Sequence, residues 1–196
     1  MNIKNRSFKS IVLSILVFIL LIVSEKLAKY VGRKYCVTCG NGTDALTLAM
    51  RVLDVKEGDA VFVPTFTFYS SAEVISLEGA TPIFVDVNET FNMDAKKLEK
   101  AIEQVKSEGK LNLKAIVAVD LFGQTANFPE ILEIANKYGL KVVEDAAQGF
   151  GGSISGKKAC SFGDISTTSF FPAKPLGCYG DGGAVFTDDE EMYQLL

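Results

Sequence analysis

The sequence predicts an α/β domain of three layers, in which helices cover both faces of a mostly parallel sheet. Short apolar runs, such as 60–64 and 140–147, alternate along the chain with amphipathic segments such as 94–109. The apolar runs contain few polar residues, which is typical of parallel strands buried on both faces. Strands that alternate with helices in this way indicate crossover connections and a layered α/β fold.

The expected elements follow one another from residue 34 to the end of the chain. Strands are expected at 34–39, 60–64, 82–87, 114–123, 140–147, 166–171 and 182–188. Helices are expected at 43–55, 70–79, 94–109, 128–139 and after 188. Thr43 and Asp94 are the expected N-caps of their helices, Gly79 and Gly109 mark helix ends, and Pro129 suits a first turn.

Composition limits the classes of function that the chain can serve. Its 196 residues suit one ordinary domain or part of a larger one, and 48% of them are hydrophobic. The net charge of −4 gives no electrostatic support for a nucleic-acid partner. The chain has no histidine, which excludes Ser-His and Cys-His nucleophile pairs within it and any histidine-ligated metal. We expect no metal site.

Four cysteines occur, and the first two form a C-x-x-C motif at Cys36 and Cys39. Cys160 and Cys178 lie 18 residues apart and far along the chain, which does not suit a four-thiolate zinc site. A thioredoxin-like redox pair is the second interpretation, because a helical pattern follows the motif. Buried, reduced thiols in a cytoplasmic protein are the favoured interpretation.

The N-terminal segment 1–24 differs from the rest of the chain. Lys4, Arg6 and Lys9 precede the apolar run 11–23, in which one serine is the only polar residue. A basic start followed by such a run resembles a signal-peptide core or a short membrane anchor. No small-x-small cleavage site follows it. A buried helix or strand, or a degraded stretch of a longer parent, are the alternatives.

Two loops that follow predicted strands carry groups suited to binding a ligand, and ligands in such sheets bind beyond the carboxyl ends of the strands. After the first strand, Gly42 frees the backbone while Thr43 and Asp44 open a helix. A glycine-rich turn at a helix start binds phosphate, although the glycine can simply form the turn. After the second strand, Phe68 offers an aromatic face, and packing in the core is its alternative.

Two later loops add a carboxylate and a lysine. The loop after the apolar stretch 140–144 starts with Asp145 and includes Gln148, and Asp145 can alternatively cap a helix. Lys174 lies between two prolines and is followed by a glycine-rich stretch. Together the four loops supply a phosphate anchor, an aromatic face, a carboxylate and a nucleophilic amine. These are the groups that hold pyridoxal phosphate, whose aldehyde bonds to lysine and whose ring nitrogen pairs with a carboxylate.

Seven ordered motifs, including GNGTDAL, VVEDAAQ and SFFPAKPLGCYGDGGA, resemble those of the DegT/StrS-type sugar aminotransferases over residues 25–196. The resemblance implies the aspartate-aminotransferase fold and pyridoxal phosphate as cofactor. It implies that Lys174 is the lysine bonded to the cofactor and that Asp145 pairs with the ring nitrogen. Gln148 then lies by the ring hydroxyl and Phe68 stacks on the ring. Gly42, Thr43, Asp44 and Ser169 match the phosphate-binding residues.

The family activity implied by this resemblance is transfer of an amino group, commonly from glutamate, to a keto group of a nucleotide-linked sugar. Family members are nearly twice as long, form dimers, and carry a C-terminal small domain. We therefore expect 25–196 to be a partial large domain, and this chain alone to be inactive as a transaminase. An inactive fragment that at most binds the cofactor, or a membrane-anchored module without catalysis, are the alternative functions.

Overall fold

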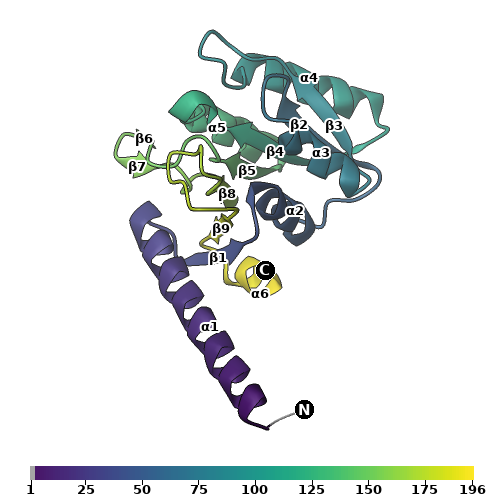
Figure 1. Ribbon diagram of the computed structural model, residues 1–196. Helices are drawn as coiled ribbons and strands as arrows, with labels where there is room; N and C mark the ends of the chain where they lie inside the picture. The colour runs from purple at the N-terminus through teal and green to yellow at the C-terminus, as the bar shows by residue number, and fades with distance from the viewer. Residues whose placement is uncertain (1–2) are drawn as a thin grey trace.

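A seven-stranded sheet forms the centre of the protein in the computed structural model, which describes residues 3–196 and their side chains from residue 8 onward (Figure 1). Residues 1 and 2 of the predicted N-terminal segment lie outside the described part. The strand order is β1-β9-β8-β5-β4-β2-β3. The strands are β1 (Tyr35–Cys39), β2 (Asp59–Pro64), β3 (Thr81–Val85), β4 (Asn112–Val119), β5 (Lys141–Asp145), β8 (Ile165–Ser169) and β9 (Gly183–Thr187).

The sheet is mostly parallel, as the sequence predicts. Neighbouring strands from β3 to β8 are parallel, whereas β9 runs antiparallel to both β8 and β1. The parallel strands therefore end at one edge of the sheet, where ligands bind in this architecture. A two-stranded hairpin of β6 (Ser153–Ile154) and β7 (Lys157–Lys158) lies outside the sheet and was not expected from the sequence.

Helices cover both faces of this sheet and produce the three predicted layers. The helices are α1 (Ile3–Val31), α2 (Gly42–Val52), α3 (Ser70–Leu77), α4 (Ala95–Glu108), α5 (Phe128–Tyr138) and α6 (Glu190–Leu195), with a 3₁₀ turn at Leu121–Gly123. Alternate residues of β2 point to opposite layers. Val61 and Val63 pack in the core with α2 and α3, whereas Ala60 and Phe62 pack with α4 and α5.

The helix boundaries confirm two of the predicted caps and correct one. Asp94 caps α4 by accepting hydrogen bonds from the backbone amides of its first turn, and Gly109 ends that helix in the left-handed conformation. The prediction that Thr43 caps α2 is wrong. Asn41 is the N-cap, and its Oδ1 accepts a hydrogen bond of 2.8 Å from the amide of Asp44. An asparagine two residues earlier in the turn satisfies the amide of Asp44 in place of Thr43.

Helix α1 projects from the domain and meets it only at its C-terminal end (Figure 1). Ala28 and Val31 are buried against β1 and β9, and Tyr30 stacks on Phe150 at 5.4 Å between ring centroids. The helix continues without a break across residue 24, where the sequence suggested a boundary. From residue 8 to residue 23 its side chains have little or no contact with the sheet, and its large apolar residues there are exposed except for the half-buried Ile22.

Candidate active site

A cavity of about 650 Å³ lies at the edge of the sheet where the parallel strands end. The last residues of three strands line it, namely Val119 of β4, Asp145 of β5 and Ser169 of β8. The start of α2 and the loops after β2 and β8 complete the wall. All eight residues selected from the sequence line this one cavity: Gly42, Thr43, Asp44, Phe68, Asp145, Gln148, Ser169 and Lys174.

The first turn of α2 forms one side of the cavity. The first amides of a helix have no acceptor within the helix, and the helix dipole makes this end attractive to an anion. Asn41 satisfies only the amide of Asp44, and its Nδ2 also donates to the Asp44 carboxylate at 3.1 Å. Thr43 does not cap the helix, and it lines the wall of the cavity. This turn is suited to hold a phosphate group.

Gly42 permits close contact between the start of α2 and the end of β8. A Cβ atom on Gly42 would lie 2.7 Å from the Cβ of Ser169, which is closer than real side chains approach. The Ser169 hydroxyl accepts a hydrogen bond of 3.3 Å from the amide of Phe171 and retains its own proton for a second partner. The helix start and a serine hydroxyl are thereby brought to the same anion-binding position.

We expect Gly42→Ala to reduce the affinity for pyridoxal phosphate by about 10-fold or more, because the added methyl group separates Ser169 from the α2 amides. The affinity for unphosphorylated pyridoxal should change little. Absorbance titrations with both compounds measure the difference. Gly180→Ala is the matched control, since a Cβ there meets no atom within 4 Å. Equal loss for pyridoxal and its phosphate would contradict a phosphate site at this turn.

Asp145 is a buried carboxylate at the floor of the cavity. Its Oδ2 accepts a hydrogen bond of 2.8 Å from the Ser71 hydroxyl, and its Oδ1 accepts one of 3.1 Å from the amide of Ala147. Burial raises the pKa of Asp145, while these hydrogen bonds and the charge of Lys174 act to lower it. The residues directly after Asp145 form a turn at 147–151 and no helix, so Asp145 is not a helix cap. A cationic group in the cavity would offset the cost of keeping this carboxylate ionised.

Lys174 and Phe68 face each other across the cavity mouth. Lys174 lies in the loop between β8 and β9, and its Nζ is 5.8 Å from the centroid of the Phe68 ring. The Phe68 side chain is 64% exposed, which rules out the interpretation that it packs in the core. Gln148 also lines the cavity, and its Oε1 accepts a hydrogen bond of 3.1 Å from the amide of Phe122.

Sequence reasoning missed several residues of this site. Ser71, at the start of the helix expected at 70–79, was not selected, although it donates a hydrogen bond to the Asp145 carboxylate and contacts the Thr67 hydroxyl at 2.9 Å. Asn41 was overlooked as the cap next to Gly42. Asp181 lines the cavity from the far end of the lysine loop. Its position between Gly180 and Gly182 was the only feature of the sequence that could have indicated a role in the site.

A model of the DegT/DnrJ/EryC1/StrS aminotransferase family matches residues 23–196. The chain belongs to this family. It is 49% identical over 171 residues to UDP-2-acetamido-2-deoxy-3-oxo-D-glucuronate aminotransferase of Pseudomonas aeruginosa, covering 87% of this chain and 46% of the relative. It is 47% identical to UDP-N-acetyl-3-dehydro-alpha-D-glucosamine 3-aminotransferase of Acidithiobacillus ferrooxidans, covering 84% and 43%.

Solved structures of similar proteins have the same fold. A family aminotransferase from Brucella abortus is 48% identical, with a TM-score of 0.86, covering 87% of this chain and 46% of the other. DesV of S. venezuelae, solved with a ketimine intermediate, is 36% identical with a TM-score of 0.83, covering 89% and 46%. The chain thus spans about half the length of the DegT relatives it matches. Named relatives of this family are sugar aminotransferases, and neighbours are solved in pyridoxal or pyridoxamine phosphate forms.

Independently of the family match, the residues that line the cavity of this DegT-family chain suit pyridoxal phosphate. The close packing of Gly42 on Ser169 forms a cradle for the phosphate. The buried carboxylate of Asp145 matches a protonated ring nitrogen, and Lys174 is the one lysine that lines the cavity within residues 3–196. These residues would hold the cofactor at its phosphate, its ring nitrogen and its aldehyde carbon.

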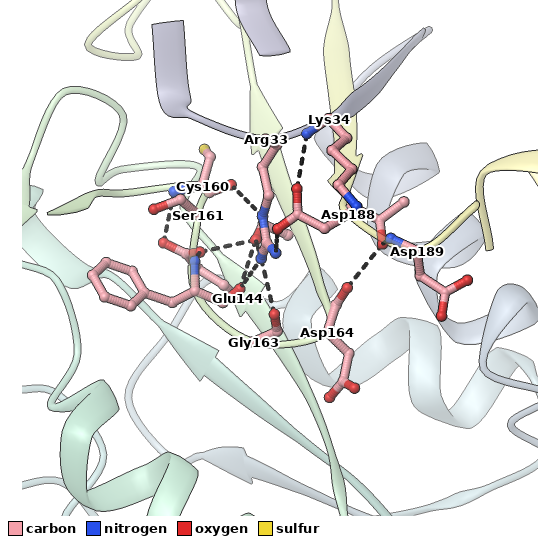
Figure 2. Close-up of polar contacts among 12 residues, drawn as sticks. Arg33, Lys34, Glu144, Cys160, Ser161, Gly163, Asp164, Asp188 and Asp189 are labelled. Atoms are coloured by element: carbon pink, nitrogen blue, oxygen red, sulfur yellow. Dashed lines mark hydrogen bonds and ion pairs between the residues drawn. The ribbon is translucent and has the colours of Figure 1, made fainter. Parts of the chain in front are cut away.

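Behind the DegT-family cavity, a buried polar cluster holds β5 in place (Figure 2). Glu144 precedes Asp145 and points to the opposite face of the sheet. Its carboxylate accepts hydrogen bonds from the amides of Cys160 and Phe162, each at 2.7 Å, and from the Ser166 hydroxyl at 2.9 Å. Burial raises the pKa of Glu144, and these bonds act against that rise.

Arg33 completes this cluster from the segment between α1 and β1 (Figure 2). Its Nη2 donates to the carbonyl oxygens of Phe162 and Gly163 at 2.5 and 2.9 Å, and to the Ser166 hydroxyl at 3.1 Å. Its Nη1 forms an ion pair of 2.9 Å with Asp188, just beyond β9. Arg33 therefore ties the N-terminal part of the domain to the loop before β8 and to the end of β9.

Asp120 lies one residue beyond β4 and is fully buried next to this cluster. Its Oδ1 accepts a hydrogen bond of 2.9 Å from the amide of Ala126, whereas its Oδ2 has no partner among the described residues. Burial and the negative charge of Glu144 raise the pKa of Asp120 well above its ordinary value.

Proposed function

We propose that the protein transfers an amino group, with glutamate as donor, to the keto group of a nucleotide-linked sugar by means of pyridoxal phosphate. The observation that carries this proposal is the gathering of Lys174, Asp145 and the Gly42 turn around one cavity. Membership of a family whose named relatives are sugar aminotransferases supports it. Because the chain spans about half of those relatives, its own activity is part of the proposal.

The bound cofactor supplies an electron sink for negative charge that develops at the substrate carbon. Asp145 would hold the ring nitrogen of the cofactor and, as a buried carboxylate, would favour its protonated form. Lys174 would hold the cofactor at its aldehyde carbon, and its amine would be the group that takes and returns a proton at the substrate carbon. Phe68, which faces Lys174 in the cavity lining, would hold the ring and limit the access of water to it.

For the acceptor we propose a UDP-linked 3-keto sugar. The two relatives at 49% and 47% identity are both named for aminotransfer to UDP-linked sugars that carry a 3-oxo or 3-dehydro group. Other relatives are named for dTDP- and GDP-linked sugars, at 45% and 42% identity. We further propose that the product serves amino-sugar or cell-surface polysaccharide synthesis, in the cytoplasm, and that the whole protein forms a homodimer.

Two alternatives compete with this function. Solved neighbours at 29–30% identity include GDP-4-keto-6-deoxymannose-3-dehydratase, whereas the relatives at 49% and 47% identity are named as aminotransferases, which favours aminotransfer. The second alternative is an inactive chain that at most binds the cofactor. A coupled assay of the purified chain with glutamate and a panel of keto-sugar nucleotides distinguishes an inactive chain from an active aminotransferase. Turnover in this assay would support the proposed function, whereas cofactor binding without turnover would favour the inactive alternative.

Borohydride reduction in the presence of pyridoxal phosphate tests the cofactor assignment. We expect peptide mass analysis to find the reduced cofactor on Lys174, because this lysine lines the cavity opposite Phe68. Lys174→Arg should abolish this label, whereas Lys100→Arg, which changes an exposed lysine of α4, should leave it intact. A label on another lysine, with Lys174 unmodified, would overturn the assignment and with it the proposed chemistry.

Attachment to a membrane through residues 11–23 is a separate proposal, because it depends on α1 and on no residue of the cavity. Residues Phe8–Val31 form a helix long and apolar enough to cross a bilayer, and the family match begins at residue 23. Membrane attachment would hold a nucleotide-sugar site near the bilayer surface.

A further inference from the structure

We propose that α1 enters a bilayer and that a lysine-lined cavity at its C-terminal end binds the anionic headgroups of that bilayer. This deepens the membrane attachment proposed above and is independent of the aminotransferase proposal. Three features of the structure support it: the exposure of apolar side chains along α1, the length of the apolar part, and the position of three lysines.

The apolar part of α1 has no protein partner along most of its length. Only 6% of its most apolar 18-residue window is buried, which argues against a core helix of a soluble domain. The exposed side chains occupy consecutive positions and so surround the helix instead of forming one stripe: Ile15, Leu16, Val17, Phe18, Ile19, Leu20 and Leu21 are 48–63% exposed. A helix that is apolar all round fits a bilayer interior better than an interface.

Lysines flank the apolar part of this helix at both ends. Lys9 and Lys26 lie about 26 Å apart at the helical rise, on either side of the apolar run 11–23, against a hydrocarbon core of about 30 Å, and lysine side chains near helix ends reach the headgroups. Ala28 and Val31, at the end of the helix, are buried against the domain and lie outside that core. On this C-terminal side, Lys26 and Lys29 follow the run, together with one acidic residue, Glu25.

A cavity of about 490 Å³ lies beside this second end, between α1 and the β6–β7 hairpin. Lys29 of α1 and Lys157 and Lys158 of the hairpin line it. Lys158 places its Nζ 3.6 Å from the centroid of the Tyr30 ring, so the hairpin is held against the helix by a cation–π contact. The lysines come from two segments about 130 residues apart, which concentrates positive charge at one position along α1.

The one carboxylate in this cavity does not neutralise its lysines. Asp188 accepts a hydrogen bond of 2.9 Å from Arg33 and one of 2.8 Å from the amide of Lys34, and these contacts lower its pKa. Its charge is therefore balanced from the domain side. The positive charges of Lys29, Lys157 and Lys158 remain available to phosphate groups of lipids at the level where the apolar helix ends.

Vesicle flotation of the full chain, purified in mild detergent and diluted without cofactor, tests this inference. We expect the protein to float with vesicles of phosphatidylcholine and about tenfold more strongly with vesicles that contain 30% phosphatidylglycerol. Lys157→Gln/Lys158→Gln should remove most of this anionic preference but retain binding to neutral vesicles. High salt should weaken the preference in the unchanged chain. Lys96→Gln/Lys100→Gln on α4, with the same change in charge, is the matched control.

A second variant tests the helix itself. Leu16→Asp/Leu20→Asp should abolish flotation with both vesicles, because each carboxylate is costly at the centre of a bilayer. Circular dichroism of each variant shows that the domain remains folded. Absence of flotation of the unchanged chain, its assembly into soluble oligomers through α1, or an undiminished anionic preference in the hairpin variant would each overturn the inference. Borohydride labelling of Lys174 in the hairpin variant tests the cofactor site separately.

Discussion

Replacing Asp145 with asparagine lowers the rate of the amino-donor half-reaction by about 100-fold or more, while the affinity for pyridoxal phosphate changes much less. A neutral amide occupies the same space and still accepts the hydrogen bond from Ser71, so the fold and the cavity persist. It cannot keep the ring nitrogen protonated, and the electron sink is lost. Single-turnover absorbance changes with glutamate, in a full-length family member that carries the same VVEDAAQ segment, measure the rate.

Two comparisons test whether the loss of rate comes from the loss of the negative charge at position 145. Absorbance titration of this chain and its Asp145→Asn variant should give similar cofactor occupancy. Ser71→Ala, which retains the carboxylate but removes its 2.8 Å hydrogen bond, should lower the rate by about 10-fold or less. An unchanged rate in the asparagine variant, or a parallel loss of rate and occupancy, would refute the role of Asp145.

Replacing Arg33 with methionine lowers the free energy of unfolding by about 3–5 kcal/mol, the largest loss of stability that we expect from one substitution. The Arg33 side chain is 5% exposed and donates to the loop before β8, to the Ser166 hydroxyl and to Asp188. Methionine fills a similar volume but leaves buried carbonyl oxygens and the nearby Glu144 carboxylate without this positive charge. Urea unfolding followed by circular dichroism measures the change.

Arg51→Met is the matched control for this prediction. Arg51 also forms a salt bridge, at 2.8 Å to Glu78, but its side chain is 66% exposed. Water screens such a pair, so its removal should cost less than about 1 kcal/mol. Similar losses in the two variants would show that the Arg33 cluster contributes no more than a surface ion pair.

The sequence predicted the sheet, its mainly parallel direction and the helices of both layers, because hydrophobic periodicity and helix-end residues are local signals. It also selected residues that share one cavity, since Asp145 and Ser169 end parallel strands and such ends meet at one edge of the sheet. The error at Thr43 was local too. Several residues of that turn can cap a helix, and only the backbone conformation of Asn41 decides between them.

The polar cluster behind the cavity could not be predicted from the sequence. Arg33 contacts residues 127–155 positions away, and no local pattern encodes such pairings. Glu144 was passed over beside Asp145, because the two carboxylates look alike in the sequence. The β6–β7 hairpin was missed as well, since strands of two residues carry no measurable periodicity.

The neighbouring carboxylates Glu144 and Asp145 make β5 sensitive to a shift of its register by one residue. Adjacent residues of a strand face opposite sides, so a deletion of one residue before Glu144 in β5 moves each carboxylate to the other face of the sheet. Glu144 would take the place of Val143 in the apolar core, and Asp145 would take the place of Glu144, where its shorter side chain would not reach the amides of Cys160 and Phe162. One such deletion would damage the cofactor partner and the internal support together, whereas a substitution at either position damages one of them.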